Sequence, residues 1–133
     1  INFINMISKH ISDKEGVYSI TAIRRGLDNT PNQFELSNMK ESAEQVFEPL
    51  REWVGVPIRI NSFYRSKALN KAIGGSTSSQ HCKGQAMDID DTRCKKTNAE
   101  MYEWVKEILN FDQMIWEFGD DKNPIGFILV TSM

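Results

Sequence analysis

A histidine and an aspartate seven positions apart are the residues of this chain best suited to holding a metal ion. His81 and Asp88 lie in the stretch SQHCKGQAMD, which reads as a loop that enters a strand. Neutral imidazole and carboxylate both bind zinc, which in catalytic sites takes three protein ligands and keeps a fourth position for water. The spacing alone favours a simpler alternative, a surface histidine and a strand-end aspartate that never meet.

The elements around this pair decide whether the two side chains can converge. Gly84 allows a tight turn or a close backbone approach directly after the histidine. In the strand that follows, Ala86 and Asp88 share one face, and Met87 and Ile89 share the other. A small residue on the same face as the carboxylate leaves room for an ion beside it.

The pattern Ser-x-His-x-x-Gly-x-Ala-x-Asp resembles the signature of the zinc D-Ala-D-Ala carboxypeptidase and Hedgehog-type peptidase family, which includes phage endolysins and cell-wall peptidases. Further segments resemble the same family: a strand ending in a Ser-x-Tyr-Arg-Ser turn, the helix and glycine turn after it, and a late strand. In this chain they are residues 58–66, 69–75 and 111–119.

The resemblance implies an α+β fold in which a small, mainly antiparallel sheet carries the zinc site and helices flank the sheet. It implies a zinc metallopeptidase that acts on peptidoglycan stem peptides, either a D,D-carboxypeptidase or a phage endolysin-like endopeptidase. His81 and Asp88 would hold the zinc. The metal would polarise the substrate carbonyl and activate water for its hydrolysis.

Arg65, Ser79 and Gln80 are the candidate substrate-contacting residues, and Arg65 is also the candidate catalytic one. The guanidinium fork of Arg65 is suited to gripping a substrate carboxylate through two hydrogen bonds, although most arginines are solvated surface cations. Ser79 either orients His81 through its second ring nitrogen or only caps the loop.

The chain departs from the family pattern near its end. The family ends in a strand carrying Asp-Trp-x-His, which supplies the general base and the third zinc ligand, whereas residues 125–128 here read IGFI. The only other histidine, His10, is expected to be structural or on the surface. We therefore expect impaired catalysis. A peptidase would need a third ligand from another chain or from the remaining candidates, Cys82, Glu117, Asp120 and Asp121; an inactive homologue binding cell-wall peptide or a protein would not.

We hypothesise that a single-base deletion after Pro124 produced this ending. Suitable codons read one frame over give Asp-Trp-Ile-His, which would place the lost acid at Ile125 and the lost histidine at Ile128.

Composition indicates an ordinary water-exposed domain rather than a nucleic-acid or membrane protein. The 133 residues predict one domain over 1–133, and a net charge of −2 provides no broad basic field for nucleic acid. No apolar run approaches the roughly 18 residues of a membrane span, and no signal peptide is recognisable. An endolysin-like protein would thus be made in the cytoplasm and act at the cell wall. Cys82 and Cys94 are expected to be free thiols, with a disulfide, or Cys82 as a zinc ligand, as alternatives.

Capping signals and periodicity predict the remaining elements. Helix N-terminal capping boxes are expected at Ser12–Glu15, Thr30–Gln33 and Thr97–Glu100. A short helix is expected over Ser19–Arg25, ended by Gly26. The first thirty residues should form a helical cap. The second box should open the longest helix, whose core stripe is Met39, Ala43, Val46, Phe47, Leu50 and Trp53.

Later in the chain, strands are expected at Val56–Asn61 and Met114–Phe118, and a short helix at Ser66–Ile73. Pro49 is expected to kink the long helix. The last helix should bury Met101, Trp104, Val105, Ile108 and Leu109. Asp90 and Asp91 raise the alternative of calcium, although an EF-hand spacing is absent.

Overall fold

The computed structural model describes residues 6–91 and 95–109, and the backbone of residues 113–119 and 124–130. Two antiparallel sheets and several helices make an α+β fold, which confirms the predicted fold class. The larger sheet has the strand order β3-β4-β6-β5. Its strands are β3 (Arg59–Ser62), β4 (Ala86–Asp90), β5 (Gln113–Gly119) and β6 (Pro124–Val130).

The N-terminal region is more than the helical cap that the sequence predicts. It opens with a two-stranded hairpin, β1 (Met6–Ser8) and β2 (Ile11–Ser12), before the short helices α1 (Asp13–Val17) and α2 (Ile20–Arg25). The expected Ser12–Glu15 capping box is present, and Gly26 ends α2 in the left-handed conformation with φ 65°. The strands escaped prediction because each is too short to show alternation.

The longest helix begins two residues later than predicted. Its cap is Asn32, which forms a reciprocal box with Glu35, whereas the backbone N–H of Thr30 donates to Asp28. The Thr30–Gln33 box is therefore wrong, because Thr30 belongs to the preceding turn. The helix runs through α3 (Gln33–Ser42), a π-helical segment (Ala43–Phe47) and α4 (Glu48–Val54), and ends at Gly55.

The irregular segment lies directly before the proline that the sequence singled out. Pro49 has no N–H to donate, and its ring would clash with the carbonyl four residues earlier in a regular α-helix. The wider π-helical turn at Ala43–Phe47 accommodates this defect without ending the helix. The structure thus shows a change of helical pitch before Pro49, and the kink itself stays a prediction.

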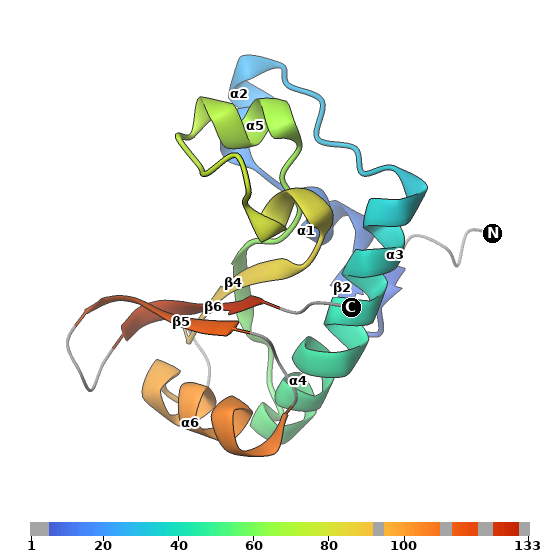
Figure 1. Ribbon diagram of the computed structural model, residues 1–133. Coiled ribbons are helices and arrows are strands. Elements are labelled where there is room, and N and C mark those ends of the chain that lie inside the picture. The colour runs from blue at the N-terminus through green and yellow to red at the C-terminus, as the bar shows by residue number, and fades with distance from the viewer. Residues whose placement is uncertain (1–5, 92–94, 110–112, 120–123, 131–133) are drawn as a thin grey trace.

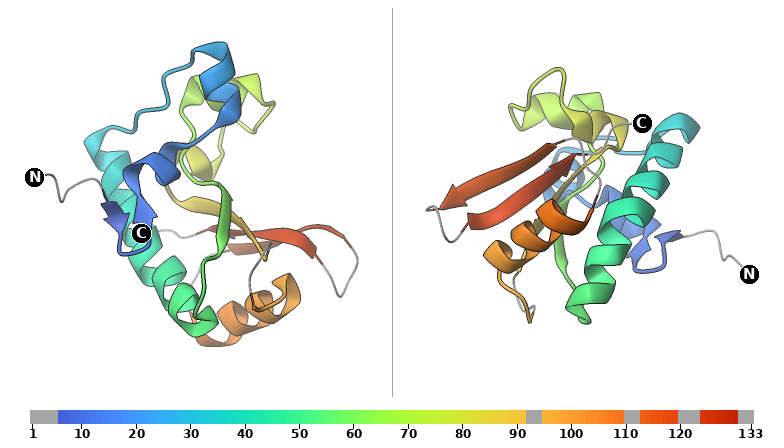
Figure 2. Two further views of the ribbon diagram at one scale, coloured as in Figure 1. Left: turned by 180° about the vertical axis from the view of Figure 1, so that it is seen from behind. Right: turned by 60° about the horizontal axis from the view of Figure 1, so that its bottom comes forward.

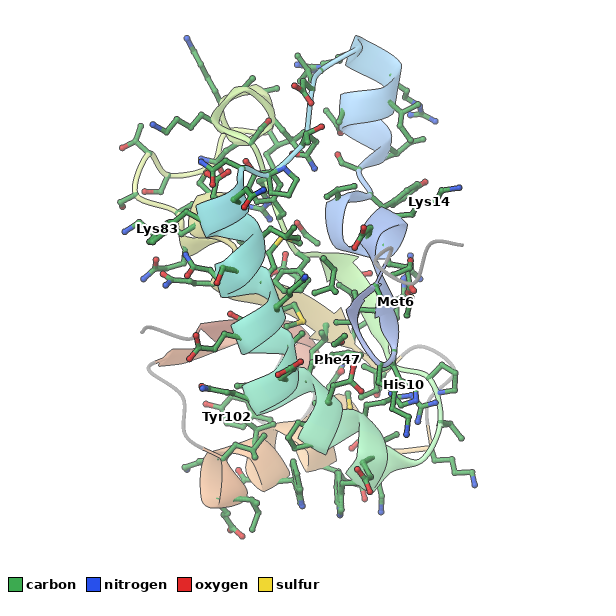
Figure 3. All side chains as sticks on the ribbon, turned by 90° about the vertical axis from the view of Figure 1, so that its right-hand side faces the viewer. Met6, His10, Lys14, Phe47, Lys83 and Tyr102 are labelled. Atoms are coloured by element: carbon green, nitrogen blue, oxygen red, sulfur yellow. The ribbon has the colours of Figure 1, made fainter. Side chains whose placement is uncertain are left out.

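Helices enclose the larger sheet. α6 (Asn98–Ile108) contacts β6 on one side of the sheet, while α5 (Lys67–Ala72) and α2 lie on the other side (Figures 1 and 2). Figure 3 shows the α3–α4 rod across the sheet with Phe47 pointing into the interior. None of the helices in the described part of the chain is long and apolar enough to cross a membrane.

The buried core confirms most of the predicted helical stripe. Met39, Ala43, Val46, Phe47 and Leu50 are almost wholly buried beside Met87 and Ile89 of β4. In α6 the Thr97–Glu100 box is present and Met101 and Val105 are buried. Ile108 was expected in the core but is 61% exposed, because α6 ends there and its last turn extends past the core.

Candidate metal and substrate site

Strands β3 and β4 bring the two halves of the site together. They pair antiparallel with Ser62 opposite Asp88, and the register is irregular between Ile60 and Ser62. Strand β3 begins at Arg59 rather than at the predicted Val56. Directly after β3, the Phe63 carbonyl contacts His81 and the Arg65 side chain contacts Asp88.

A short 3-10 helix, η2 (Gln80–Lys83), carries the histidine. Ser79 caps it by accepting a hydrogen bond from the backbone N–H of His81 at 3.2 Å, and Gly84 ends it with φ 76°. Gly84 lies so close to α3 that an added Cβ would stand 2.6 Å from the Glu35 carbonyl oxygen. Only glycine fits both this conformation and this contact.

Two polar side chains of α3 hold the end of η2 in place. Asn38 Nδ2 donates to the Lys83 carbonyl at 3.0 Å, and the buried Ser42 hydroxyl donates to the Gly84 carbonyl at 3.1 Å. These bonds satisfy carbonyls at the end of the short helix, which would otherwise be unpaired. The long helix therefore fixes the position of η2, the short helix that carries His81.

His81 and Asp88 are in direct contact and buried. His81 Nε2 lies 3.1 Å from Asp88 Oδ1, and the residues are 4% and 8% exposed. His81 Nδ1 donates to the Phe63 carbonyl at 2.7 Å, because a carbonyl can only accept. In the neutral ring the lone pair is then on Nε2 and faces the carboxylate. A proton or a cation between these two atoms makes the arrangement favourable, and a fixed tautomer of this kind is typical of metal-binding histidines.

Arg65 completes the cluster from the same turn. Its Nη2 lies 3.3 Å from Asp88 Oδ2 and its Nε donates to the Ser62 hydroxyl at 3.0 Å. The backbone N–H of Arg65 donates to the His81 carbonyl at 3.1 Å. One guanidinium edge is thus used within the protein, while 17% of the side chain stays exposed.

Asn29, in the loop before α3, bonds the backbone of the residues on both sides of Arg65, Tyr64 and Ser66. Its Nδ2 donates to the carbonyls of Val17 and Tyr64, and its Oδ1 accepts from the backbone N–H of Ser66 at 2.6 Å. The resemblance covers this loop but assigns no role to Asn29. Since these contacts join residues 12 to 37 positions apart, no local pattern could have revealed them.

Tyr64 is held inside the same turn. Burial raises the pKa of its phenol, and the bond from its hydroxyl to Glu35 Oε1 at 2.9 Å raises it further. Tyr64 therefore stays protonated and acts as a hydrogen-bond donor to α3. This contact is a second link between α3 and the turn that carries Arg65.

The predicted role of Ser79 takes its alternative form, whereas the substrate contact of Gln80 stays a prediction. Phe63, not Ser79, bonds the second ring nitrogen of His81, and Ser79 caps η2, which was the alternative for that residue. Gln80 is half-buried, and its Oε1 has no hydrogen-bond partner among the described residues. The backbone carbonyl of Phe63 could not have been identified from sequence, because any residue type supplies one.

Of the other candidate ligands, only Cys82 has a side chain within the described part of the structure, and it forms no metal-binding group of three there with His81 and Asp88. Cys82 is a free cysteine, and burial raises the pKa of its thiol even though Arg65 and Lys67 act in the opposite direction. Glu117 lies on β5, separated from β4 by β6, and its side chain is outside the described part of the structure. Cys94, Asp120 and Asp121 also lie outside the described residues.

The alternative calcium pair and the second histidine have structural partners. Asp90 accepts from Asn61 Nδ2 at 2.7 Å, and Asp91 accepts from the backbone N–H of Asn98 at 2.9 Å. His10 Nδ1 lies 2.6 Å from Glu48 Oε1. Figure 3 shows His10 well away from Lys83, the neighbour of the site on η2.

Zinc suits the donor chemistry of this site, but its ligand set is incomplete among residues 6–91 and 95–109. Nitrogen of neutral imidazole and carboxylate oxygen are zinc ligands, and His81 and Asp88 supply one of each. No group of three histidine, cysteine, aspartate or glutamate side chains able to hold a metal occurs among the described residues. The described cluster supplies two of the three protein ligands that catalytic zinc takes.

Comparison with known proteins supports the resemblance inferred from the motifs. The family described as Peptidase M15 matches residues 9–118, a span that contains Arg65, His81 and Asp88 and ends before β6. Peptidases of this family are generally zinc-dependent. No curated protein matches the chain at a significant level. Because the match covers well over half of the 133 residues, this chain belongs to the peptidase M15 family of zinc D-Ala-D-Ala carboxypeptidase-like proteins.

Proposed function

We propose that this chain is a peptidoglycan peptidase domain of the endolysin type, impaired because its sequence lacks the Asp-Trp-x-His ending that supplies the third zinc ligand and the acid/base residue. His81 and Asp88 would bind zinc, and a stem peptide would occupy the exposed side of the cluster. The observation that carries this proposal is the 3.1 Å contact between His81 Nε2 and Asp88 Oδ1, since the Phe63 carbonyl directs the ring lone pair at that carboxylate.

Arg65 supports the peptidase proposal by its position. Its guanidinium bonds Asp88 and Ser62 along one edge and is partly exposed, so the remaining N–H groups can meet a substrate carboxylate. It would orient a peptide against the cluster. In the same position it holds Asp88 when substrate is absent.

Zinc, when bound in a complete site, polarises a carbonyl and activates water. The described residues fall one ligand short of that site, and we assign no catalytic step to this chain. The same shortfall favours a second candidate function, a catalytically inactive homologue that binds cell-wall peptide or a protein partner. Such a module needs Arg65 and the exposed surface around it but not a full metal site.

Zinc titration of the chelator-stripped chain, with a competing chromophoric chelator, tests the proposal. We expect weak binding that His81→Asn and Asp88→Asn each abolish, while Glu44→Gln, an exposed change on the long helix, leaves it unchanged. Binding that survives both site substitutions would overturn the assignment of the ligands.

Incubation with purified muropeptides and zinc, followed by mass spectrometry, separates the two functions. Slow cleavage that His81→Asn removes supports the impaired peptidase. Saturable peptide binding to the stripped chain without any cleavage supports the binding module.

A further inference from the structure

A pocket lies beside the His81 cluster and has a different chemistry from it. Its volume is about 460 Å³, and α5, the loop after it and η2 form its walls. Lys67, Asn70 and Lys71 line it from α5, and Cys82 lines it from η2. Because Cys82 directly follows His81, this pocket adjoins the candidate metal site through η2.

The wall of the pocket is built around a buried amide. Asn70 is 4% exposed; its Nδ2 donates to the Ser76 carbonyl at 2.7 Å, and its backbone carbonyl accepts from Gly75 N–H at 2.8 Å. A Cβ at Gly75 would overlap the Asn70 amide oxygen. The loop is therefore held in one shape against α5, and glycine is required at the point of contact.

The charge of the pocket is positive. Lys67 and Lys71 are four residues apart and share one face of α5. Neither forms an ion pair with another described residue, and the pocket lining contains no acidic side chain. In a chain with 18 acidic and 16 basic residues, two uncompensated lysines over a recess attract an anion rather than stabilise the fold.

We propose that this pocket binds a carboxylate side chain of a peptide lying along the His81 cluster. The proposal rests on the proposed function in one respect, namely that the ligand is a peptide. Lys67 and Lys71 would meet the carboxylate, and their stems together with Thr77 and Cys82 would contact the adjoining chain. An acidic residue would thereby be selected next to the segment at the candidate metal site.

Protection of Cys82 from alkylation tests the proposal without depending on zinc or catalysis. Iodoacetamide is uncharged, and mass spectrometry of the peptide containing Cys82 reports its modification separately from Cys94. The probes are acetyl-Ala-Glu-Ala-amide and its glutamine isostere, which differ only in the charge. Each rate is expressed relative to the same protein without peptide, since a lysine substitution also changes the reactivity of the thiol.

For a millimolar Kd, the glutamate peptide at ten times that concentration should slow alkylation about tenfold, and the glutamine peptide should have little effect. Lys67→Gln with Lys71→Gln should abolish the protection, whereas Lys106→Gln on α6, on the far side of the sheet, should retain it (Figure 1). Equal protection by both peptides, or by neither, would overturn the proposal. Equal protection of Cys82 by inorganic phosphate would overturn the assignment to a peptide carboxylate and show that the pocket is a general anion site.

The same experiment on the metal-stripped His81→Asn protein separates this proposal from the proposed function. Protection that persists there, in a protein that neither binds zinc nor cleaves muropeptides, leaves the carboxylate pocket standing when the peptidase assignment fails. If the parent chain binds zinc but the glutamate peptide does not protect Cys82, the carboxylate pocket is overturned and the peptidase assignment stands.

Discussion

Asp88 and Ile128 are directly paired across strands β4 and β6. Directly opposed positions of an antiparallel pair have Cβ atoms about 4.5–5.5 Å apart on the same face of the sheet. A histidine introduced at position 128 would therefore start beside the carboxylate that His81 already contacts. This is also the position at which the frameshift hypothesis places the lost histidine.

We predict that Ile125→Asp, Gly126→Trp and Ile128→His together convert weak zinc binding into tight binding of one ion. The third ligand completes the site, and a gain of at least about tenfold in affinity, or about 1.4 kcal/mol, is the expected minimum. Competition titration of the stripped proteins measures it.

The control for this prediction replaces Ile128→His by Leu129→His. Leu129 pairs with Met87, one register position along, so its histidine would start from the other face of the sheet. Equal zinc affinity in the two variants would contradict the proposed geometry. The encoding DNA tests the origin separately: the hypothesis fails when its shifted frame after Pro124 does not spell Asp-Trp-x-His.

Gly84→Ala should destabilise the fold more than Gly26→Ala. Both glycines have positive φ, where alanine costs about 1–2 kcal/mol. At Gly26 nothing lies within 4 Å of an added Cβ, whereas at Gly84 the Cβ would meet the Glu35 carbonyl and Met39. The collision should add about 1–3 kcal/mol. Urea unfolding of the two variants measures the difference, and equal free energies of unfolding would show that η2 does not pack on α3 as described.

Asn29→Asp should loosen the turn that carries Arg65. The change removes two N–H donors and sets a carboxylate against the carbonyls of Val17 and Tyr64, at a cost of about 1–3 kcal/mol. Hydrogen exchange at the backbone N–H of Arg65, bonded to the His81 carbonyl, should accelerate. Gln33→Glu, the same change of an amide to a carboxylate at an exposed position of α3, serves as the control, and equal exchange in both variants would contradict the positioning role of Asn29.

Acid should weaken the attachment of the N-terminal hairpin to α4. Burial raises the pKa of Glu48, but hydrogen bonds from Ser8 and His10 outweigh it and lower the pKa below its ordinary value of 4.5. The resulting stability is fully present above pH 4.5 and is lost as pH falls through the lowered folded-state pKa. Urea unfolding between neutral and acid pH should show this loss in the parent and not in Glu48→Gln. The exposed substitution Glu44→Gln is the control and should keep the pH dependence of the parent. If Glu48→Gln also keeps it, the acid sensitivity comes from a group other than Glu48.

The sequence by itself determined the family and the main elements of the fold, because those signals are local. The motif from Ser79 to Asp88, through its resemblance to the family and not through its spacing alone, identified both members of the buried pair. The capping boxes at Ser12 and Thr97 predicted two helix starts. The stripe from Met39 to Leu50 predicted the face of the long helix that reaches the core. Each of these depends on residues within a few turns or one strand of one another.

Only the tertiary structure decided what surrounds the pair. The Phe63 carbonyl sets the tautomer of His81, and Asn29 ties the Arg65 turn from a distant loop; both are contacts between segments far apart in the chain. The pairing of Asp88 with Ile128 likewise depends on sheet register, which follows from how β4 and β6 align in space. Residue types near one another in sequence predict ligands, whereas the partners that orient those ligands are selected by the packing of the whole fold.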